Sequence, residues 1–490
     1  MDLVAASRQA VEAVARWEGR WEPFATHPSV AVDAERAEAV LGELAERLRV
    51  TYPFFHPSYA GQMLKPPHPV AAAAYLMAML VNSNNHALDG GPATSALERE
   101  AVAEIAAMLH YPDACLGHLT SSGTMANLEA LFVARELRPD AAIAFSEEAH
   151  YTHARMCHLL GVRAVSVAAD ARGRLDLDAL ERVLRGGGIS TVVLTAGTTA
   201  LGAVDAIDEA LALRDRYGVR LHVDAAYGGF YAIPAWGDAA AGSDPARSPA
   251  GRPPSGGPPP VTGHARDVAS APGASASLPL PRAALRAISR CDSVAIDPHK
   301  HGLQPYGCGC VLFRDASVGS FYRHDSPYTY FSSRDLHLGE VSLECSRAGA
   351  AAAALWATLR ALPLTESGLG AVLAACRRAA LRFASSVRAS SRLGLHQEPE
   401  LDIVTFFPWC AGMPARDVDG ASQALYERAA AADPPIHLSV ARVGDAAFRL
   451  RHPHSGDAGG PVRVLRSVLM KPEHEEVAAT LVERLDALAG

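Results

Sequence analysis

Short apolar runs alternate with amphipathic stretches through the middle of the chain, between about residues 81 and 300. The apolar runs are rich in Val, Ile and Ala and span 141–145, 164–168, 191–196, 219–224 and 293–297. Stretches with helical periodicity lie between them, at 127–137, 176–185 and 205–217. Strands that are apolar on both faces and alternate with helices indicate a largely parallel sheet covered by helices, which is the α/β class.

The two ends of the chain have different patterns. Residues 1–80 predict helices joined by a stretch rich in Pro, His and aromatic residues, which is typical of a segment that wraps over another body. Near the C-terminus, helical stretches precede strand-like runs at 402–407, 437–443 and 462–468 and a final amphipathic helix at 473–488. We therefore expect an N-terminal wrapping segment (1–80), a large domain (81–355) and a smaller C-terminal α+β domain (356–490).

One segment interrupts the alternation inside the large domain. Residues 241–281 contain ten prolines, six glycines and no aromatic residue. A segment of this composition buries too little apolar surface to order itself, so we expect a mobile surface insert.

The composition is that of an ordinary globular protein, with 49% apolar and 20% charged residues in a chain of 490. The net charge of −8 offers no basic footprint for a nucleic acid. The eight cysteines form no CxxC pair, which favours reduced thiols in a cytosol. The longest apolar run, 69–81, is too short to span a bilayer, and the N-terminus lacks the apolar core of a signal peptide. We expect a cytoplasmic protein with no membrane or nucleic-acid partner.

Lysine chemistry is easy to locate because the chain has only three lysines. One of them, Lys300, belongs to SVAIDPHKHGLQPYGCGC (293–310), where an apolar strand ends at Asp297 and the following loop presents His299 and Lys300. Ligands bind at the strand ends of α/β sheets. A partly desolvated lysine amine at that edge can form a Schiff base with a carbonyl. Taken alone, an ion-paired surface lysine is the alternative interpretation.

A second motif places an acid at the end of another strand. LHVDAAYGGFY (221–231) has Asp224 followed by small residues, Ala226 among them, which allow a flat ring to approach the backbone. A buried carboxylate needs a cationic partner, and a protonated pyridine nitrogen is such a partner. An Asp that caps the next turn is the structural alternative.

A third motif precedes a helix. In LTSSGTMANLEALFVARE (119–136), Ser122, Gly123 and Thr124 come directly before an Ala- and Leu-rich stretch. Free backbone N–H groups and the positive end of the helix dipole can hold a phosphate there. An ordinary helix N-cap explains the same residues equally well.

Three histidines occur close together in SEEAHYTHARMCHLLGV (146–162): His150, His153 and His158. No Cys or carboxylate nearby has structural-zinc spacing and the HExxH motif is absent, so we expect no metal site. His150 lies between a strand and a helix, where an imidazole can stack on a planar ring or carry a proton. A solvent-exposed histidine is the alternative.

One more strand ends in Gly-Thr-Thr and brings Thr199 to the same edge of the sheet. A phosphate cradle, an acid for a pyridine nitrogen, a stacking imidazole and a Schiff-base lysine now form one set. Together they specify pyridoxal 5′-phosphate (PLP) as the cofactor.

At these motifs the sequence resembles the PLP-dependent decarboxylases of fold type I, a group that includes the aromatic-L-amino-acid, tyrosine and glutamate decarboxylases, with sphingosine-phosphate lyase as a relative. The resemblance covers roughly residues 50–470, and its most specific motifs are DPHK (297–300) and HVDAAYGG (222–229). It implies a mainly parallel seven-stranded sheet in the large domain and a homodimer with the active site at the interface.

The resemblance also implies roles for single residues. Lys300 is the lysine that binds PLP as a Schiff base, Asp224 the partner of the pyridine nitrogen, and His150 the ring-stacking histidine of an S-x-x-AH motif. The cofactor-binding residues expected from the motifs and the resemblance together are Ser122, Gly123, Thr124, His150, Thr199, Asp224, Ala226, Asp297, His299 and Lys300. Asp297 departs from the family, which often has Asn at this position.

Two further segments resemble parts of the family that act on the substrate. FYRHDSPYTYF (321–331) is similar to the mobile catalytic loop whose tyrosine protonates the carbanion; Tyr328 is our choice and Tyr330 the reserve. LECSRAG is similar to the Ser-Arg-x-Gly stretch of tyrosine decarboxylases and the lyase, which makes Arg347 a candidate for binding the substrate carboxylate.

The expected reaction is the decarboxylation of an L-amino acid, aromatic and tyrosine-like, to its amine and CO₂. The entrance segments GQMLKPPHP and NNHALDGGPATS resemble the microbial tyrosine-decarboxylase branch. The aromatic residues Tyr52, Phe54, Phe55 and Tyr59 favour an aromatic or apolar substrate, or else belong to a dimer interface. Two alternatives stay open. One is an oxidative deaminase that depends on decarboxylation and yields an aldehyde. The other is a carbon–carbon lyase of the sphingosine-phosphate lyase type, which the residues after Lys300 resemble more than they resemble the aromatic decarboxylases.

Overall fold

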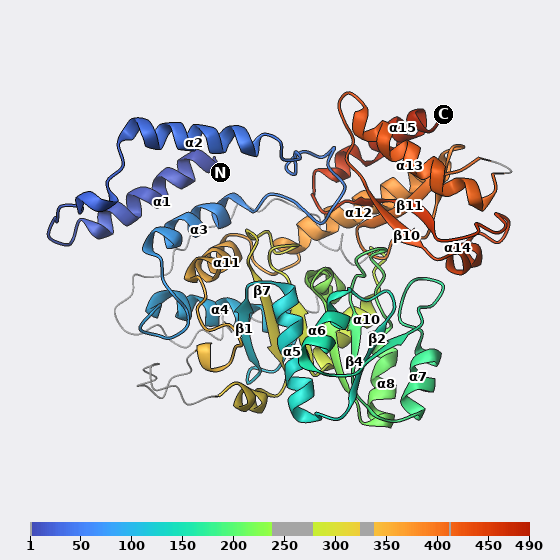
Figure 1. Ribbon diagram of the computed structural model, residues 1–490, viewed down its shortest axis with the longest axis horizontal. Helices are drawn as coiled ribbons and strands as arrows, with labels where there is room; N and C mark the ends of the chain where they lie inside the picture. The colour runs from blue at the N-terminus through green and yellow to red at the C-terminus, as the bar shows by residue number, and fades with distance from the viewer. Residues whose placement is uncertain (1, 238–277, 324–337, 411–412) are drawn as a thin grey trace.

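The computed structural model describes residues 2–237, 278–323, 338–410 and 413–490, and Figure 1 shows two bodies with an N-terminal arm. The larger body contains a seven-stranded sheet in the order β1-β7-β6-β5-β4-β2-β3. Its strands are β1 (Leu116–Thr120), β2 (Ala142–Ser146), β3 (Ala164–Val167), β4 (Ile189–Thr195), β5 (Arg220–Asp224), β6 (Ser293–Ile296) and β7 (Gly309–Phe313). Among these seven, β7 alone runs in the direction opposite to the other six. The predicted α/β class with a mainly parallel seven-stranded sheet is confirmed.

Helices cover both faces of this sheet because the central strands are apolar on both sides. Ile143 and Val193 pack with the helices of one face, whereas Ala144 and Val192, their neighbours along the strands, pack on the other. The first face carries α5 (Gly123–Leu137) and α6 (Thr152–Leu160). The second carries α4 (Pro92–Met108), α7 (Leu177–Arg185), α8 (Ile207–Tyr217), α10 (Arg282–Ala287) and α11 (Gly349–Ala361), and the short α9 (Ala232–Trp236) contacts α10.

The smaller body is built on a four-stranded antiparallel sheet in the order β10-β11-β9-β8. Its strands are β8 (Leu393–Leu395), β9 (Ile403–Pro408), β10 (Ser439–Val443) and β11 (Val462–Val468). Its helices are α12 (Leu369–Ala389), α13 (Ala415–Ala431), α14 (Asp445–Arg451) and α15 (His474–Ala489). Phe383, Leu425 and Leu481 of α12, α13 and α15 share one buried cluster with β9 and β11, so this part is α+β as predicted.

The N-terminal arm consists of α1 (Leu3–Glu18), α2 (Ala34–Leu48) and α3 (Pro69–Val81). Helix α3 packs against α1 and α11, whereas α2 has no buried residue and extends beside α1 away from the sheets (Figure 1). No helix in the described ranges is both long and apolar enough to cross a bilayer. The expected insert lies outside the described residues up to position 277.

Two of the three lysines are structural. The Nζ atoms of Lys65 and Lys471 donate hydrogen bonds to the carbonyl oxygens of Met470 and Tyr59, at 3.1 and 2.6 Å. Neither amine is exposed, and burial lowers the pKa of Lys471 to about 8. These contacts join the segment between α2 and α3 to the smaller body.

Candidate active site

Lys300 lies on the turn that follows β6, and the turn is fixed by hydrogen bonds on both sides. The Lys300 N–H donates to the Asp297 carbonyl at 2.9 Å, and Lys300 Nζ lies 3.1 Å from Asp297 Oδ2. His299 Nε2 lies 3.4 Å from the same oxygen, and its Nδ1 lies 2.7 Å from the Cys308 carbonyl at the start of β7. The buried carboxylate of Asp297 therefore holds the amine of Lys300 at the carboxyl edge of the sheet.

Asp224 ends β5, the strand beside β6, and its carboxylate is buried. Its Oδ1 accepts the Ala226 N–H at 3.1 Å, and its Oδ2 lies 3.0 Å from His153 Nε2. Burial alone would raise the pKa of this carboxyl. The hydrogen bond and charge of His153, the charge of Lys300 and the Ala226 N–H outweigh burial and hold the pKa of Asp224 well below its usual range.

His153 contacts Asp224 and was not selected as a site residue from the sequence. It lies in the first turn of α6 with its side chain fully buried, and the hydrogen bond described above is its contact with the site. His150 lies before α6, so the spacing of three residues does not place the two imidazoles on one helical face, and no sequence pattern marked His153 as a partner of Asp224. The described residues contain no group of three or more His, Cys, Asp or Glu arranged to hold a metal ion.

The helix α5 begins at the cavity. Ser122 is its N-cap, and its Oγ accepts the Met125 N–H at 3.3 Å. A Cβ at Gly123 would lie 2.5 Å from Asp297 Oδ2, so only a glycine allows this close approach. Asn127, one turn further on, donates to the Gly123 carbonyl at 2.8 Å and thereby fixes the first turn. The positive end of the α5 dipole thus faces the carboxyl edge of the sheet.

His150 follows β2 and faces the same cavity. Its Nδ1 lies 2.8 Å from Thr152 Oγ1, which orients the ring. Burial lowers the pKa of His150, and the charge of Lys300 lowers it further, against the opposing charge of Asp224. A neutral imidazole at neutral pH is therefore available as a flat surface.

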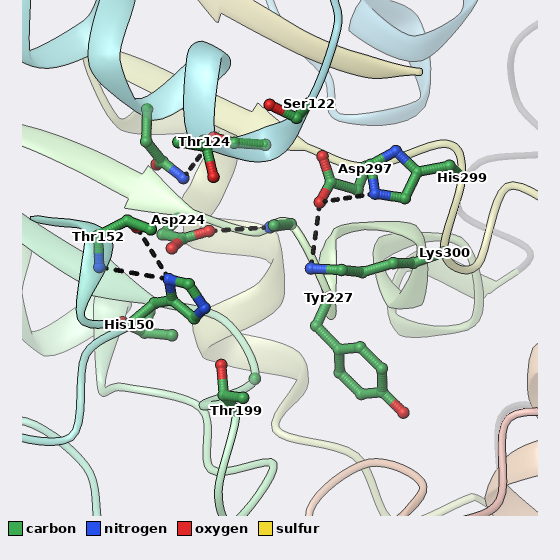
Figure 2. A pocket seen from close by; sticks show the side chains of 15 residues that line it. Ser122, Thr124, His150, Thr152, Thr199, Asp224, Tyr227, Asp297, His299 and Lys300 are labelled. Atoms are coloured by element: carbon green, nitrogen blue, oxygen red, sulfur yellow. Dashed lines mark hydrogen bonds and ion pairs between the residues drawn. The ribbon is translucent and has the colours of Figure 1, made fainter. Parts of the chain in front are cut away.

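These residues enclose one cavity of about 180 Å³ at the carboxyl ends of β2, β4, β5 and β6 (Figure 2). All ten residues expected to bind the cofactor line it: Ser122, Gly123, Thr124, His150, Thr199, Asp224, Ala226, Asp297, His299 and Lys300. Five others that the sequence analysis did not select also line it: Asn127, Thr152, Thr195, Gly197 and Tyr227. The structure thus brings together residues from five separate segments of the chain.

The donor set fits one kind of ligand. The start of α5 suits a phosphate, the buried Asp224 suits a protonated ring nitrogen, the Lys300 amine suits an aldehyde, and His150 suits a planar ring. Two buried cavity oxygens, Thr195 Oγ1 and Asp297 Oδ1, have no hydrogen-bond partner among the described residues. Buried polar atoms are normally satisfied, so these two are free for a bound group.

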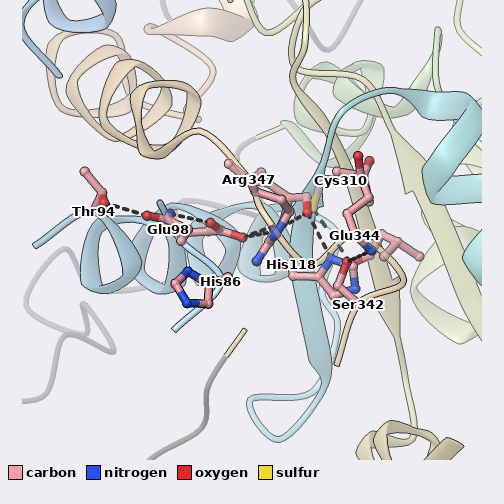
Figure 3. Close-up of polar contacts among 12 residues, drawn as sticks. His86, Thr94, Glu98, His118, Cys310, Ser342, Glu344 and Arg347 are labelled. Atoms are coloured by element: carbon pink, nitrogen blue, oxygen red, sulfur yellow. Dashed lines mark hydrogen bonds and ion pairs between the residues drawn. The ribbon is translucent and has the colours of Figure 1, made fainter. Parts of the chain in front are cut away.

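Arg347 does not reach this cavity in its own chain. Its Nη1 lies 2.7 Å from Glu98 Oε1 and donates to the Leu119 carbonyl, and its side chain is 8% exposed (Figure 3). The buried carboxylate of Glu98 also accepts the Leu119 N–H, so Arg347 and Glu98 together hold the end of β1. The tyrosines proposed for proton transfer, Tyr328 and Tyr330, lie outside the described residues.

The fold and the cavity define a PLP-dependent enzyme of fold type I. The model of the family described as "Pyridoxal-dependent decarboxylase conserved domain" matches residues 25–248 and 267–408. The chain therefore belongs to the pyridoxal-dependent decarboxylase family, as its motifs predicted. The unmatched residues 249–266 fall inside the Pro- and Gly-rich segment.

Individual relatives agree with this assignment. The chain is 29% identical over 450 residues to the L-tyrosine decarboxylase of Levilactobacillus brevis, covering 75% of this chain and 70% of the relative. It is 30% identical over 419 residues to the L-tyrosine decarboxylase of Enterococcus faecium, covering 70% and 66%. The chain thus spans about two thirds of the length of these relatives. The crystal structure of mouse CSAD superposes with a TM-score of 0.73 at 20% identity, covering 99% and 98% of the two chains, which shows the shared fold.

Family membership confirms three predictions. The protein is an enzyme, its cofactor is PLP, and it is a carboxy-lyase that acts on an amino acid.

Proposed function

We propose that this protein decarboxylates an aromatic, tyrosine-like L-amino acid to its amine and CO₂, with PLP bound in the cavity around Lys300. The observation that carries the proposal is the convergence of Lys300, Asp224, His150 and the start of α5 on one cavity. The names of the two bacterial relatives, both L-tyrosine decarboxylases, support the choice of substrate.

Each cavity residue has a role in holding the cofactor. Lys300 would hold the aldehyde group of the cofactor, the backbone N–H groups of residues 122–124 with the hydroxyls of Ser122 and Thr124 would hold its phosphate, and His150 would face its ring. When bound, PLP accepts the electron pair that remains on Cα after CO₂ has left. Asp224 maintains a negative charge beside the ring nitrogen, because its lowered pKa keeps the carboxyl ionised.

His153 and Asp297 act through their neighbours. His153 donates to Asp224 and fixes the carboxylate in one orientation, since its Nε2 and the Ala226 N–H engage the two oxygens separately. Asp297 keeps the Lys300 amine at the cavity through the 3.1 Å ion pair. For Arg347 the contacts with Glu98 and Leu119 support a positioning role at the end of β1, which leads into the phosphate-binding turn.

Tyr328 is our proposed donor of the proton to Cα, on the resemblance of residues 321–331 to the family's catalytic loop. The Tyr328→Phe variant should lose amine formation and release an aldehyde with consumption of O₂. Unchanged amine yield in that variant would transfer the role to Tyr330 or another group.

We also propose a cytoplasmic homodimer. Val40, Leu41, Leu44 and Leu48 of α2 are all exposed, and they form one apolar face of a helix that has no buried residue. Exposed apolar faces of this kind mark protein–protein contacts, and a second copy of the chain is the partner we propose. All eight cysteines are free thiols, which supports a reducing compartment.

The experiment that tests the reaction is CO₂ release from the PLP-loaded protein against all common amino acids, with mass spectrometry of each product and an oxygen electrode. Amine and CO₂ from tyrosine or another aromatic amino acid are expected, and the Lys300→Ala variant serves as the blank. Aldehyde with O₂ uptake would replace the proposal with oxidative deamination. Release of CO₂ from a non-aromatic amino acid alone would overturn the proposed substrate.

A further inference from the structure

A three-residue segment of the smaller body, residues 400–402, lies against all three loops that carry Thr199, Asp224 and Lys300. It directly precedes β9 and contains Glu400, Leu401 and Asp402. None of the three lines the cavity, and the sequence analysis selected none of them.

The first two residues contact the loops after β4 and β5. Glu400 Oε2 accepts the Val204 N–H at 2.7 Å, at the end of the loop that carries Thr199. Leu401 is fully buried against Gly197 and Gly228, where an added Cβ would lie 3.1 and 2.9 Å from its Cδ1. Both glycines therefore leave room for Leu401 to reach the backbone of the cavity loops.

Asp402 contacts the loops after β5 and β6. Its Oδ1 accepts the Tyr227 hydroxyl at 2.6 Å, and its Oδ2 lies 3.3 Å from His301 Nε2. The side chains of Asp402 and His301 are 0% exposed. Tyr227 lines the cavity (Figure 2) and His301 directly follows Lys300, so one carboxylate contacts a residue of each of these two loops.

The carboxylate of Asp402 remains ionised although it is buried. Burial would raise the pKa of its carboxyl, but His301, the Tyr227 hydroxyl and the charge of Lys65 together hold the pKa below its usual value. Burial lowers the pKa of His301, against the pull of Asp402. A hydrogen bond to an ionised group is stronger than one between neutral groups, so the Tyr227–Asp402 contact is a firm one.

The segment is also anchored on its other side. Arg377 of α12 donates to the Leu401 carbonyl at 2.7 Å, and the Leu469 N–H, just after β11, donates to the Asp402 carbonyl at 2.9 Å. Asp402 is thus a fixed point of the smaller body against which Tyr227 and His301 are held.

We propose that Asp402 is a positioning residue for the PLP site: through Tyr227 and His301 it holds the loops of Asp224 and Lys300 in the geometry that binds the cofactor. The inference rests on the PLP site and is independent of the substrate. It makes cofactor affinity a property of the contact between the two bodies.

The test is a titration of the apoprotein with PLP, followed by absorbance of the lysine-bound cofactor. Asp402→Asn and Tyr227→Phe should each weaken PLP binding about ten-fold, and the double variant should bind no more weakly than the weaker single variant, because both changes remove the same contact. The matched control is Tyr231→Phe. Tyr231 is fully buried, its ring centre lies 5.3 Å from that of His301, and its hydroxyl has no hydrogen-bond partner among the described residues. It should bind PLP within two-fold of the unaltered protein.

A second readout separates positioning from general destabilisation. Hydrogen exchange of the apoprotein should quicken in the loops 196–205, 225–228 and 297–302 of the Tyr227→Phe variant, with β2 and α6 unchanged. PLP affinity within two-fold of the control in both single variants would overturn the proposal, even if their unfolding temperatures fall. No substrate enters either measurement, so the result stands apart from the identity of the amino acid.

Discussion

At Gly123 the close approach of α5 to Asp297 gives a sharp residue-level prediction. Gly123→Ala would place a Cβ 2.5 Å from a carboxylate that is itself buried and paired with Lys300. We expect PLP affinity to fall at least ten-fold, because either the helix start or the lysine partner must shift. Gly420→Ala on the exposed side of α13 is the control, since nothing lies within 4 Å of that position. Equal PLP affinity in the two variants, measured by titration of the apoproteins, would contradict the argument.

His153 leads to a second prediction. His153→Asn removes the imidazole from Asp224 Oδ2, so the pKa of the buried carboxyl should rise and kcat/KM at neutral pH should fall about 10- to 100-fold. The matched control is His158→Asn, an exposed histidine on the same helix. Steady-state decarboxylation rates compare the two; equal rates would show that Asp224 needs no partner from α6.

Residues that project from strand ends were predictable, and residues that support them were not. Lys300, Asp224 and Thr199 follow apolar runs directly, so their positions at one edge come from the parallel sheet alone. Tyr227 and Asp402 form a hydrogen bond although 175 positions separate them in the sequence, and no local sequence pattern predicts such a pair. For Arg347 a motif suggested a contact with the substrate carboxylate. In the structure its Nη1 contacts Glu98 and the Leu119 carbonyl, whereas its buried Nε and Nη2 have no partner among the described residues, so the substrate-binding role stays a prediction.

At the scale of elements, the apolar runs located the parallel strands within about two residues. Strands β1 and β7, which pair with each other at one edge of the sheet, were not predicted. Residues 297–308 connect β6 to β7 by a turn and loop without a helix, so the alternation of strand and helix that marked the other strands is absent here. An antiparallel neighbour needs no crossover helix.

Strand β5 also carries a pH-dependent prediction. Burial lowers the pKa of His222 to about 3, and the ring bridges Ser293 Oγ and Asn127 Oδ1 at 2.9 and 2.8 Å. In the unfolded chain a histidine has a pKa near 6.5, so between about pH 6.5 and 3 the unfolded state binds a proton that the native state does not. This histidine therefore lowers stability as the pH falls.

Replacement of His222 removes that one titration. From pH 7.5 to 5.0 the unaltered protein should lose about 2 kcal/mol of unfolding free energy relative to His222→Asn, from 1.36 kcal/mol for each unit below 6.5. Denaturant unfolding of both proteins at the two pH values measures the difference. Any constant cost of the substitution cancels, and parallel pH slopes would show that His222 titrates normally.

On the scale of the whole molecule, helix α2 of the arm exposes its apolar face to solvent. Leu41→Arg with Leu44→Arg places two charges on the exposed face of α2 and should convert the proposed dimer to monomer. Sedimentation velocity at micromolar concentration distinguishes the two states. Glu38→Lys, on the exposed polar side of α2, should leave the dimer intact. A dimer that survives the double substitution would place the interface elsewhere.

Composition and periodicity predicted a large domain, a smaller α+β domain and an N-terminal segment, but they did not predict how the two bodies meet. The contact between the bodies depends on Glu400, Leu401 and Asp402, which directly precede β9 and belong to no recognisable sequence motif. Burial and hydrogen bonding, which only the folded chain defines, give them their importance.

The scarcity of lysine has a practical consequence for labelling chemistry. The Nζ atoms of the buried Lys471 and the half-buried Lys65 are hydrogen-bonded to carbonyl oxygens, and Lys300 is the remaining side-chain amine, which lines a cavity. We therefore expect an acylating dye added to the folded protein to react mainly with the terminal amine and with Lys300. A carbonyl compound bound to Lys300 would protect this amine from acylation, so the extent of labelling at Lys300 would measure the fraction of occupied active sites.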